Sequence, residues 1–393
     1  MSTSISSMQN PSCLLYGAGD CRYEDRPIPS IEDPNDVIIR IAYTGVCGSD
    51  VSFWVHGGIK RQITPDNPVV MGHEASGTVH AIGSSISHLQ PGDPVAIEPG
   101  YPCRRCELCK AGRYNLCPGM KFAAVPSSCH GTLTRFFKIP GDYCHSLVPA
   151  ASASGSGSGP VDTAPKSGLG LDEAVLMEPL AVAIHSVRSV GVTLGSRVVV
   201  FGAGTVGLLC ASVAREFAAK QIIVVDVKAQ KLEFAESVIP NPHVTFGTYT
   251  PSATLSAEEN ASKILEQFDP ASQDAGGSGI PGFDVAIEAT GAEPCVQMGV
   301  HVLRAGGAYI QTGNGKRKME FPIATMAEKE ITVQGCFRYG PGDFQLGVRM
   351  ASEGRIQVKR FITKVVPFER AVEAWETTRR GEGIKTLIQG VED

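Results

Sequence analysis

The chain has 393 residues, of which 42% are hydrophobic, and carries a formal net charge of −5 at pH 7 with a pI near 6.0. This length and apolar content predict two globular domains, and the acidic balance argues against nucleic acid or an anionic membrane as a partner. The polar first residues, MSTSISSMQN, do not resemble a signal peptide, and no apolar run approaches the roughly 20 residues that cross a bilayer. We therefore expect a cytoplasmic protein that acts on small molecules. Its twelve cysteines favour thiols or metal ligands over a disulfide framework.

The first part of the chain is predicted to be rich in β-structure. From about residue 36 it contains short runs rich in β-branched residues and broken by Gly and Pro, namely DVIIRIAYTGV, EASGTVHAIG and DPVAIEPG. This pattern is typical of a β-barrel-like domain.

Cys47 in TGVCGSD and the pair His73 and Glu74 in VMGHEASG are candidate metal ligands in this region. Sulfur, imidazole and carboxylate together suit zinc with one coordination position left for water or substrate. The alternatives are that Cys47 is a buried thiol and that His73 is a hydrogen-bonded core histidine.

Four cysteines follow in the segment YPCRRCELCKAGRYNLCP, with the spacing C-x2-C-x2-C-x7-C. This spacing is typical of a closed tetrahedral zinc site, and four sulfur ligands leave no position open for catalysis. A disulfide pair and chance are the alternatives. We predict a structural zinc bound by Cys103, Cys106, Cys109 and Cys117. The basic residues that flank these cysteines either offset the charge of the metal centre or form a solvated face: Arg104, Arg105, Lys110 and Arg113.

Two segments, 149–170 and 268–282, are rich in Gly, Ser and Pro. Such composition buries too little apolar surface to offset the entropy of ordering, so we predict mobile surface loops. Glu178, in LMEPLA, comes shortly after the first of them. It is either a fourth metal ligand or an acidic residue that interacts with the dipole of a helix start.

A dinucleotide-binding loop is predicted in SRVVVFGAGTVGLLCASVAREF. Gly202, Gly204 and Gly207 form G-x-G-x-x-G between a β-branched strand and an apolar helix. The first glycine permits a tight turn, the second lets a pyrophosphate approach the backbone, and the third allows close packing of helix and strand. The later runs FDVAIEATG, GGAYIQTG and ITVQGC indicate further strands of a doubly wound α/β sheet.

Asp226 ends the next predicted strand, KQIIVVDV. A carboxylate at this position accepts hydrogen bonds from an adenosine ribose and repels a 2′-phosphate, which favours NAD over NADP. Lys228 and Lys231 lie close enough in sequence to tolerate a phosphate, and Asp226 could also be a simple cap of the strand end.

Taken together, GVCGSD, GHEASG, the cysteine segment running into GRYNLCP, MEPLAVAIHS, GAGTVG and GCFRYGPGD resemble the zinc-containing medium-chain dehydrogenases. Within that family they are most similar to the polyol branch of sorbitol and xylitol dehydrogenases, over roughly residues 35–390. The resemblance implies an α/β protein with a GroES-like β-barrel-type catalytic domain, 1–180 completed by 320–393, and a Rossmann NAD-binding domain at 181–319. It also implies a homo-oligomer, either a dimer or a tetramer.

The resemblance further implies roles for individual residues. Cys47, His73 and Glu74 would bind a catalytic zinc, with Glu178 as an alternating ligand or a holder of the zinc-bound water. Ser49 would relay a proton and Arg338 would hydrogen-bond the distal hydroxyls of the substrate. The other implied substrate residues are Phe53, Phe122 and Tyr339. The implied NAD contacts, besides the three glycines, are Val206, Asp226, Lys231, Thr312, Gly313, Asn314, Phe337 and Arg338.

These parts fit the transfer of a hydride from a secondary alcohol to NAD, because zinc acidifies a bound hydroxyl and the Rossmann domain holds the nicotinamide. Three departures affect the substrate, and one of them is the Gly/Ser-rich insertion at 149–170, just upstream of Glu178. Ser52 and Phe53 stand where polyol dehydrogenases have His and Tyr, and AVPSSCHGTL replaces a shorter family segment. The first hypothesis is therefore a polyol dehydrogenase, and the second is the same chemistry on a less polar alcohol or ketone in a specialised biosynthetic pathway. The third is a nucleotide-binding scaffold without catalysis, which the presence of every proposed ligand disfavours.

Overall fold

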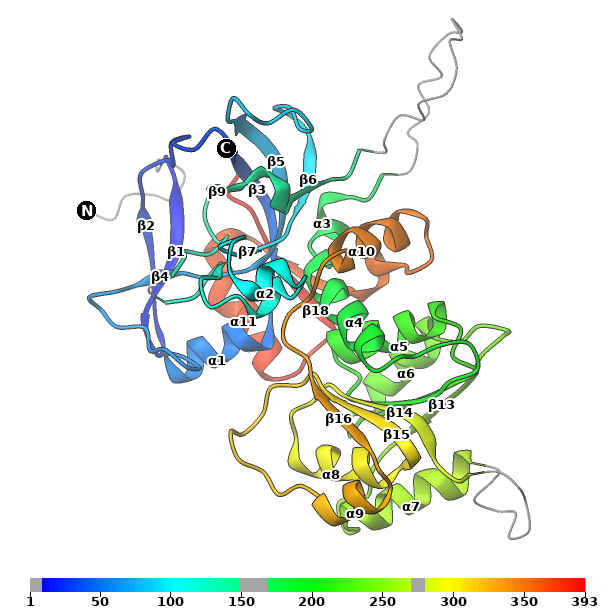
Figure 1. The fold of residues 1–393 in the computed structure, drawn as a ribbon. Coiled ribbons are helices and arrows are strands. Elements are labelled where there is room, and N and C mark those ends of the chain that lie inside the picture. Colours follow the sequence, from blue (N-terminus) through cyan, green and yellow to red (C-terminus); the bar gives the residue numbers. More distant parts are fainter. Residues whose placement is uncertain (1–8, 127, 149–167, 270–279, 393) are drawn as a thin grey trace, which may run out of the picture. The chain divides into compact units, whose positions relative to one another are not determined.

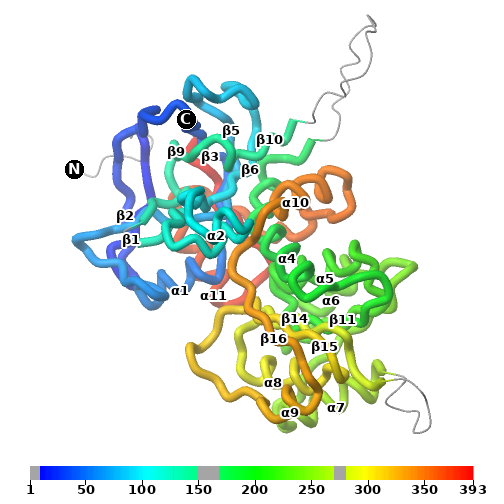
Figure 2. Tube along the Cα trace, in the orientation of Figure 1, coloured from blue at the N-terminus to red at the C-terminus, as the bar shows by residue number. Residues whose placement is uncertain are grey.

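The computed structural model describes residues 9–126, 128–148, 168–269 and 280–392 (Figure 1). The chain divides into two compact units: unit 1 contains 1–178 and 344–393, and unit 2 contains 179–343. Figure 2 shows in blue and red that both ends of the chain contribute to unit 1. Among the described residues, no helix has the length and apolar character that crossing a membrane requires.

Unit 1 is built mainly from antiparallel sheet. Its largest sheet has the order β10-β6-β5-β3-β18-β17, with β9 also paired to β3, and smaller sheets contain β2-β1-β4 and β7-β8. The strands are β1 (Pro11–Gly17), β2 (Asp20–Asp25), β3 (Asp36–Gly45), β4 (Val69–Val70), β5 (Glu74–Ile82), β6 (Pro94–Ile97), β7 (Gly100–Tyr101), β8 (Lys121–Phe122), β9 (Phe136–Pro140), β10 (Cys144–Ser146), β17 (Ile362–Val366) and β18 (Lys385–Gln389).

The helices of unit 1 are short and lie around this sheet. The α-helices are α1 (Gly48–His56), α2 (Glu107–Lys110), α3 (Leu171–Ala174), most of α10 (Asp343–Ser352) and α11 (Ala371–Arg379), and the 3-10 helices are η2 (Tyr114–Leu116), η3 (Gly141–Tyr143), η5 (Val358–Phe361) and η6 (Phe368–Arg370). One apolar cluster joins the two chain ends, with Leu14 and Leu15 of β1 packed together with Trp375 of α11 and Ile388 of β18. A second apolar cluster is formed by side chains of the large sheet and includes Ile39, in β3.

Unit 2 contains a six-stranded sheet with the order β13-β12-β11-β14-β15-β16, in which all pairs are parallel. This is the strand order of the Rossmann fold. The strands are β11 (Arg197–Phe201), β12 (Gln221–Val225), β13 (Thr245–Tyr249), β14 (Phe283–Glu288), β15 (Leu303–Gln311) and β16 (Thr332–Gly335). β12 is buried along its whole length, as expected of a parallel strand covered on both faces.

Helices cover both faces of this sheet (Figure 1). They are α4 (Met177–Ser189, which begins at the end of unit 1), α5 (Thr205–Glu216), α6 (Ala229–Val238), α7 (Ala257–Phe268), α8 (Glu293–His301) and α9 (Ile323–Glu328). On one face, Ile264 of α7 and Val296 of α8 pack into a cluster with Phe201 of β11 and Ile223 of β12.

The predicted α/β fold class is confirmed, with a β-rich part and a doubly wound parallel sheet. The units are divided after residues 178 and 343, whereas the sequence placed the divisions after 180 and 319. The second difference arises because β16 pairs with β15 and therefore continues the parallel sheet of unit 2. Most of the two segments predicted as mobile loops, at 149–167 and 270–279, lies outside the described residues.

Candidate active site

Cys47, His73 and Glu74 come together in unit 1 and form a candidate metal centre. Their ligand atoms all lie within 4.8 Å of one another, and both His73 and Glu74 are buried. Cys47 is the N-cap of α1, whereas His73 directly precedes β5 and Glu74 begins it. Three protein ligands of these types suit a zinc ion with one position open. The donor set and its geometry therefore fit the metal that the sequence predicted.

Asp50 organises two of these residues. One carboxylate oxygen, Oδ2, accepts the backbone N–H of Cys47 at 2.9 Å, and the other lies 3.5 Å from Nδ1 of His73. Burial by itself would lower the pKa of His73, but the negative charges of Asp50 and Cys47 outweigh it and raise that pKa. A carboxylate behind a ligating histidine orients the ring, so Asp50 has the position of an outer-shell partner.

Lys385, which sequence reasoning missed, is an ion-pair partner of Glu74. Its Nζ contacts Oε2 of Glu74 and donates to the carbonyl of Val46 at 3.0 Å, and both charged side chains are only 2% exposed. Burial would lower the pKa of Lys385, but the charges of Glu74 and Cys47 outweigh it and raise the pKa. A side chain at Gly45, opposite Glu74 in the sheet, would collide with the Glu74 carboxylate.

The other predicted residues of unit 1 lie at different places. Glu178 is buried but is not one of the three grouped ligands, although its charge also raises the pKa of Lys385. The ring of Phe122 lies 5.6 Å from that of His73. Ser49 lies in the first turn of α1, and Phe53, on the same helix, packs against the apolar cluster of the chain ends.

The four cysteines of the second candidate metal centre also converge. The sulfurs of Cys103, Cys106, Cys109 and Cys117 all lie within 4.8 Å of one another, around α2 and η2. Backbone N–H groups point at two of them, from Cys106 to the sulfur of Cys103 at 3.4 Å and from Cys103 to that of Cys117 at 3.3 Å. Such N–H donors stabilise thiolates, and four sulfurs fit a closed tetrahedral zinc.

The surroundings of the four cysteines differ from one ligand to the next. The N–H groups of Arg105 and Cys106 lower the pKa of Cys103 to about 6, whereas desolvation and the neighbouring thiols raise that of Cys109 to about 12. Arg104 forms an exposed ion pair with Asp142 at 2.7 Å. Of the two alternatives for the basic residues, the contacts of Arg104 favour the solvated face, because its guanidinium pairs with Asp142.

The glycine loop of unit 2 has the local geometry that its sequence predicted. Gly202 has a φ of +104°, in the region that favours glycine, and a Cβ at Gly207 would collide with the Gly202 carbonyl. Gly204 is the N-cap of α5, and a Cβ there would meet nothing within 4 Å. The N-terminus of α5 and the open side of Gly204 leave room for a pyrophosphate.

Asp226 follows β12 and contacts the glycine loop. Its Oδ2 accepts the N–H of Ala203 at 2.7 Å, and its Oδ1 accepts that of Lys228 at 2.9 Å. It therefore does cap the strand end, while each oxygen keeps a further lone pair for a ribose. Burial lowers the pKa of nearby Lys231, and the charge of Asp226 opposes this shift.

The predicted nicotinamide segment is held by Glu288, another residue that sequence reasoning missed. The backbone carbonyl of Glu288 accepts the N–H groups of Thr312 and Gly313, both at 2.8 Å. Its fully buried carboxylate accepts from the N–H of Gly291 and from the side-chain amide of Gln311. The run FDVAIEATG carried the signal, an acidic residue that ends a buried strand.

Phe337, Arg338 and Tyr339 lie after β16. Arg338 has a φ of +62°, and its guanidinium carbon lies 4.6 Å from the centroid of the Phe337 ring. Phe337 is 46% exposed and Tyr339 is buried.

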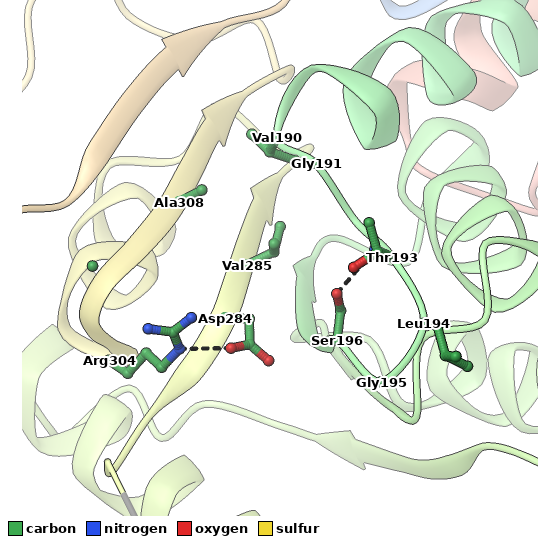
Figure 3. Close-up of a pocket in the computed structure, with 11 residues that line it drawn as sticks. Val190, Gly191, Thr193, Leu194, Gly195, Ser196, Asp284, Val285, Arg304 and Ala308 are labelled. Carbon is green, nitrogen blue, oxygen red and sulfur yellow. Dashed lines mark hydrogen bonds and ion pairs between the residues drawn. The ribbon is translucent and has the colours of Figure 1, made fainter.

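A polar pocket of about 330 Å³ lies at the opposite edge of the same sheet (Figure 3). The connection between α4 and β11 and the amino-terminal parts of β14 and β15 line it, and Arg304 contacts Asp284 there at 2.6 Å. Open α/β sheets bind ligands at the carboxyl ends of their strands, so this pocket is not the expected cofactor site.

Comparison with protein families settles the class of the protein. Residues 33–149 match the model described as "Alcohol dehydrogenase GroES-like domain", and residues 205–353 match that described as "Zinc-binding dehydrogenase". The chain belongs to the zinc-binding dehydrogenases. This membership confirms the predicted family and the prediction that zinc and a nicotinamide dinucleotide are its cofactors.

Relatives of this dehydrogenase match it along its whole length. It is 47% identical to "Probable D-xylulose reductase A" of Aspergillus terreus, over 98% of this chain and 99% of the relative. It is 46% identical to "D-xylulose reductase A" of Aspergillus niger over the full length of both. Among solved structures, L-idonate 5-dehydrogenase from Escherichia coli is 25% identical with a TM-score of 0.79, over 97% of this chain and 98% of that one.

Proposed function

We propose that this dehydrogenase oxidises a secondary hydroxyl of a polyol of the xylitol or sorbitol type and transfers the hydride to NAD, which gives a ketose. The observation that carries this proposal is the full-length identity of 46% to a protein named D-xylulose reductase A. The group of Cys47, His73 and Glu74 supports it, because its ligand types suit alcohol oxidation rather than a purely structural metal.

The residues of the site have distinct proposed roles. Cys47, His73 and Glu74 would hold the catalytic zinc, which supplies Lewis-acid chemistry that lowers the pKa of the substrate hydroxyl. Ser49, in the first turn of α1, carries the hydroxyl proton away from the site. Glu178, whose charge raises the pKa of Lys385, would be an alternating ligand of this zinc or would hold the zinc-bound water. Arg338 hydrogen-bonds distal hydroxyls of the polyol.

Further proposed contacts complete the two binding regions. Phe122, beside His73, forms an apolar wall, and Phe53 and Tyr339 complete the substrate region. The adenosine half of NAD contacts Val206, Asp226 and Lys231. The nicotinamide half is bound by Thr312, Gly313, Asn314, Phe337 and Arg338.

NAD is proposed over NADP because of Asp226. Its carboxylate stands beside the glycine loop, where it accepts from a ribose hydroxyl and repels a 2′-phosphate. A ratio of kcat/KM for NAD to that for NADP well above one supports this choice. A ratio below one would contradict it.

A second candidate function is the oxidation of a less polar secondary alcohol by the same chemistry. Ser52 donates its hydroxyl to the carbonyl of Gly48 within its own helix, and Phe53 packs against an apolar cluster. Neither side chain replaces the polar groups that polyol dehydrogenases have at these positions, which favours a less polar substrate.

One experiment separates these functions. NADH formation is followed with zinc-replete protein, NAD and one of three substrates: xylitol, sorbitol or 2-butanol. Efficient oxidation of the polyols supports the first function, and a preference for 2-butanol supports the second. Binding of NADH and zinc without turnover of any substrate would revive the scaffold hypothesis.

Two further predictions concern the whole molecule. We propose a cytoplasmic location, which agrees with the twelve cysteines being thiols. We also propose a homo-oligomer, a dimer or a tetramer, which sedimentation of the purified protein tests.

A further inference from the structure

The loop between β16 and α10 contains a conformational outlier. Arg338 has a φ of +62° although it is not glycine. An L-residue in the left-handed region costs free energy and persists only where its surroundings impose that backbone. The surroundings of Arg338 should therefore contain groups that hold the loop on both sides of it.

On its carboxyl side the loop is held by Asp343, a carboxylate that is 1% exposed. Its Oδ2 accepts the N–H of Gly340 at 2.8 Å and lies 2.9 Å from Nδ1 of His185, while its Oδ1 accepts from Arg188 at 2.5 Å. A Cβ at Gly340 would lie only 3.2 Å from the His185 ring, so this turn is closely packed against α4.

On its amino side the same helix holds the loop through Ser186. The hydroxyl of Ser186 lies 3.2 Å from the sulfur of Cys336 and 3.0 Å from the hydroxyl of Thr312. The N–H of Cys336 donates to the carbonyl of Gln311 at 2.8 Å. Consecutive residues of α4, His185 and Ser186, thus fix the two ends of the segment that carries Arg338.

We infer that Asp343 is a positioning residue for substrate specificity: through Gly340, His185 and Arg188 it fixes the backbone of the loop that carries Arg338, the residue proposed to hydrogen-bond distal hydroxyls of the polyol. This inference rests on the proposed function. The inferred role of Asp343 concerns the binding of long polar substrates, since the hydroxyl that reacts would bind at the metal and would need no contact with Arg338.

The test is Asp343→Asn, which keeps the size of the side chain and removes its charge. We expect KM for xylitol to rise about tenfold, which corresponds to about 1.4 kcal/mol, while kcat stays within about threefold. KM for 2-butanol should change by less than about twofold. Arg188→Gln removes only one donor to Asp343 and should raise KM for xylitol by about two- to threefold. This milder variant keeps the inference testable if Asp343→Asn does not fold.

The matched control is Asp284→Asn. Asp284 also pairs with an arginine, Arg304, and accepts a backbone N–H, from Arg197 at 2.7 Å, but it lies in the pocket at the amino edge of the sheet (Figure 3). It should lower Tm without changing KM for xylitol. A control that raised KM as much as Asp343→Asn would show that any loss of stability in unit 2 has this effect, which overturns the inference.

A double variant decides whether Asp343 acts through Arg338. Added to Arg338→Ala, Asp343→Asn should raise KM for xylitol no further, because the group it positions is gone. Equal increases of KM for xylitol and 2-butanol, or additive effects in the double variant, would overturn the inference. A wild-type protein that does not oxidise polyols would refute the proposed function as well, whereas an unchanged xylitol KM in Asp343→Asn refutes the inference alone.

Discussion

The two candidate metal centres of unit 1 differ in what holds their ligands. The four cysteines all come from residues 103–117, and backbone N–H groups of the same segment contact their sulfurs. Cys47 is the N-cap of α1, whereas His73 and Glu74 lie at the start of β5, and the buried charges of Asp50 and Lys385 hold these ligands. In the first centre a bound metal would hold one segment of the chain together, whereas in the second the folded domain itself positions the ligands.

This difference separates stability from catalysis. A centre with four thiolates leaves no position for a substrate and stabilises the fold around it. A centre with three ligands that the domain already supports can exchange water and substrate while the protein stays folded. A change at one centre should therefore alter one of these two properties and leave the other nearly unchanged.

The largest expected effect is that of Cys47→Ser on activity. Lewis-acid stabilisation of the transition state is worth several kcal/mol, so at tenfold per about 1.4 kcal/mol the rate should fall about a thousandfold. Metal analysis should find one zinc per chain in place of two, and Tm should change little. If the variant oxidised the wild-type substrate at the wild-type rate, Cys47 would not be a ligand of the catalytic metal.

Lys385→Met should destabilise the domain strongly. It leaves the carboxylate of Glu74, 2% exposed, without its ion-pair partner, and breaking a buried pair costs about 3–5 kcal/mol. Zinc would compensate part of that charge, so zinc should raise the Tm of the variant by more than it raises that of the wild type. Differential scanning calorimetry with and without a chelator measures this.

The control for Lys385→Met is Lys359→Met. Lys359 also forms an ion pair, with Asp172, but its side chain is 60% exposed. Exposed pairs contribute about 0–1 kcal/mol, so this variant should melt close to the wild type. Equal losses in both variants would show that the buried pair has no special part in supporting Glu74.

Cys106→Ser should lower the stability of the protein and leave its activity nearly unchanged, which is the reverse of the effect expected of Cys47→Ser. Loss of one of the four sulfurs would weaken the binding of the structural zinc. We therefore expect a destabilisation of about 2 kcal/mol, or a fall in Tm of about 4–8 °C. The initial rate of freshly prepared enzyme should stay within about twofold of the wild type. An immediate loss of activity with an unchanged Tm would assign the four cysteines to the chemistry instead.

The two centres also show what could be predicted from the sequence. The four cysteines and the glycine loop are local patterns, in which the spacing itself brings the groups together. Lys385 was missed because it lies 311 residues from Glu74 and meets it only where β18 joins β3. Asp343 and His185 are 158 residues apart and meet only because the loop after β16 packs against α4. His185 lies in the motif MEPLAVAIHS and Asp343 in GCFRYGPGD. A motif, however, does not show which partner a side chain will contact.

The smallest expected effect concerns the segment that leads into His73. Nδ1 of His130 accepts the N–H of Val70 in β4, and it can do so only as the neutral imidazole. Partial burial of the ring, helped by the charge of Arg26, lowers the pKa of His130 to about 4. Since the folded pKa is below the ordinary 6.5, the stabilisation is complete above about pH 6.5 and is lost as the pH falls towards about 4.

His130→Asn tests this, because the amide oxygen can accept the same N–H at every pH. The difference in Tm between wild type and variant should shift by about 2 °C between pH 7 and pH 4, in favour of the variant at the acid end. The shift is small because His130 is exposed as a whole and solvent screens its charge. Loss of zinc in acid affects both proteins and cancels in the difference. If the difference in Tm between the two proteins stayed constant with pH, the hydrogen bond from Val70 to a neutral His130 would not stabilise the segment before His73.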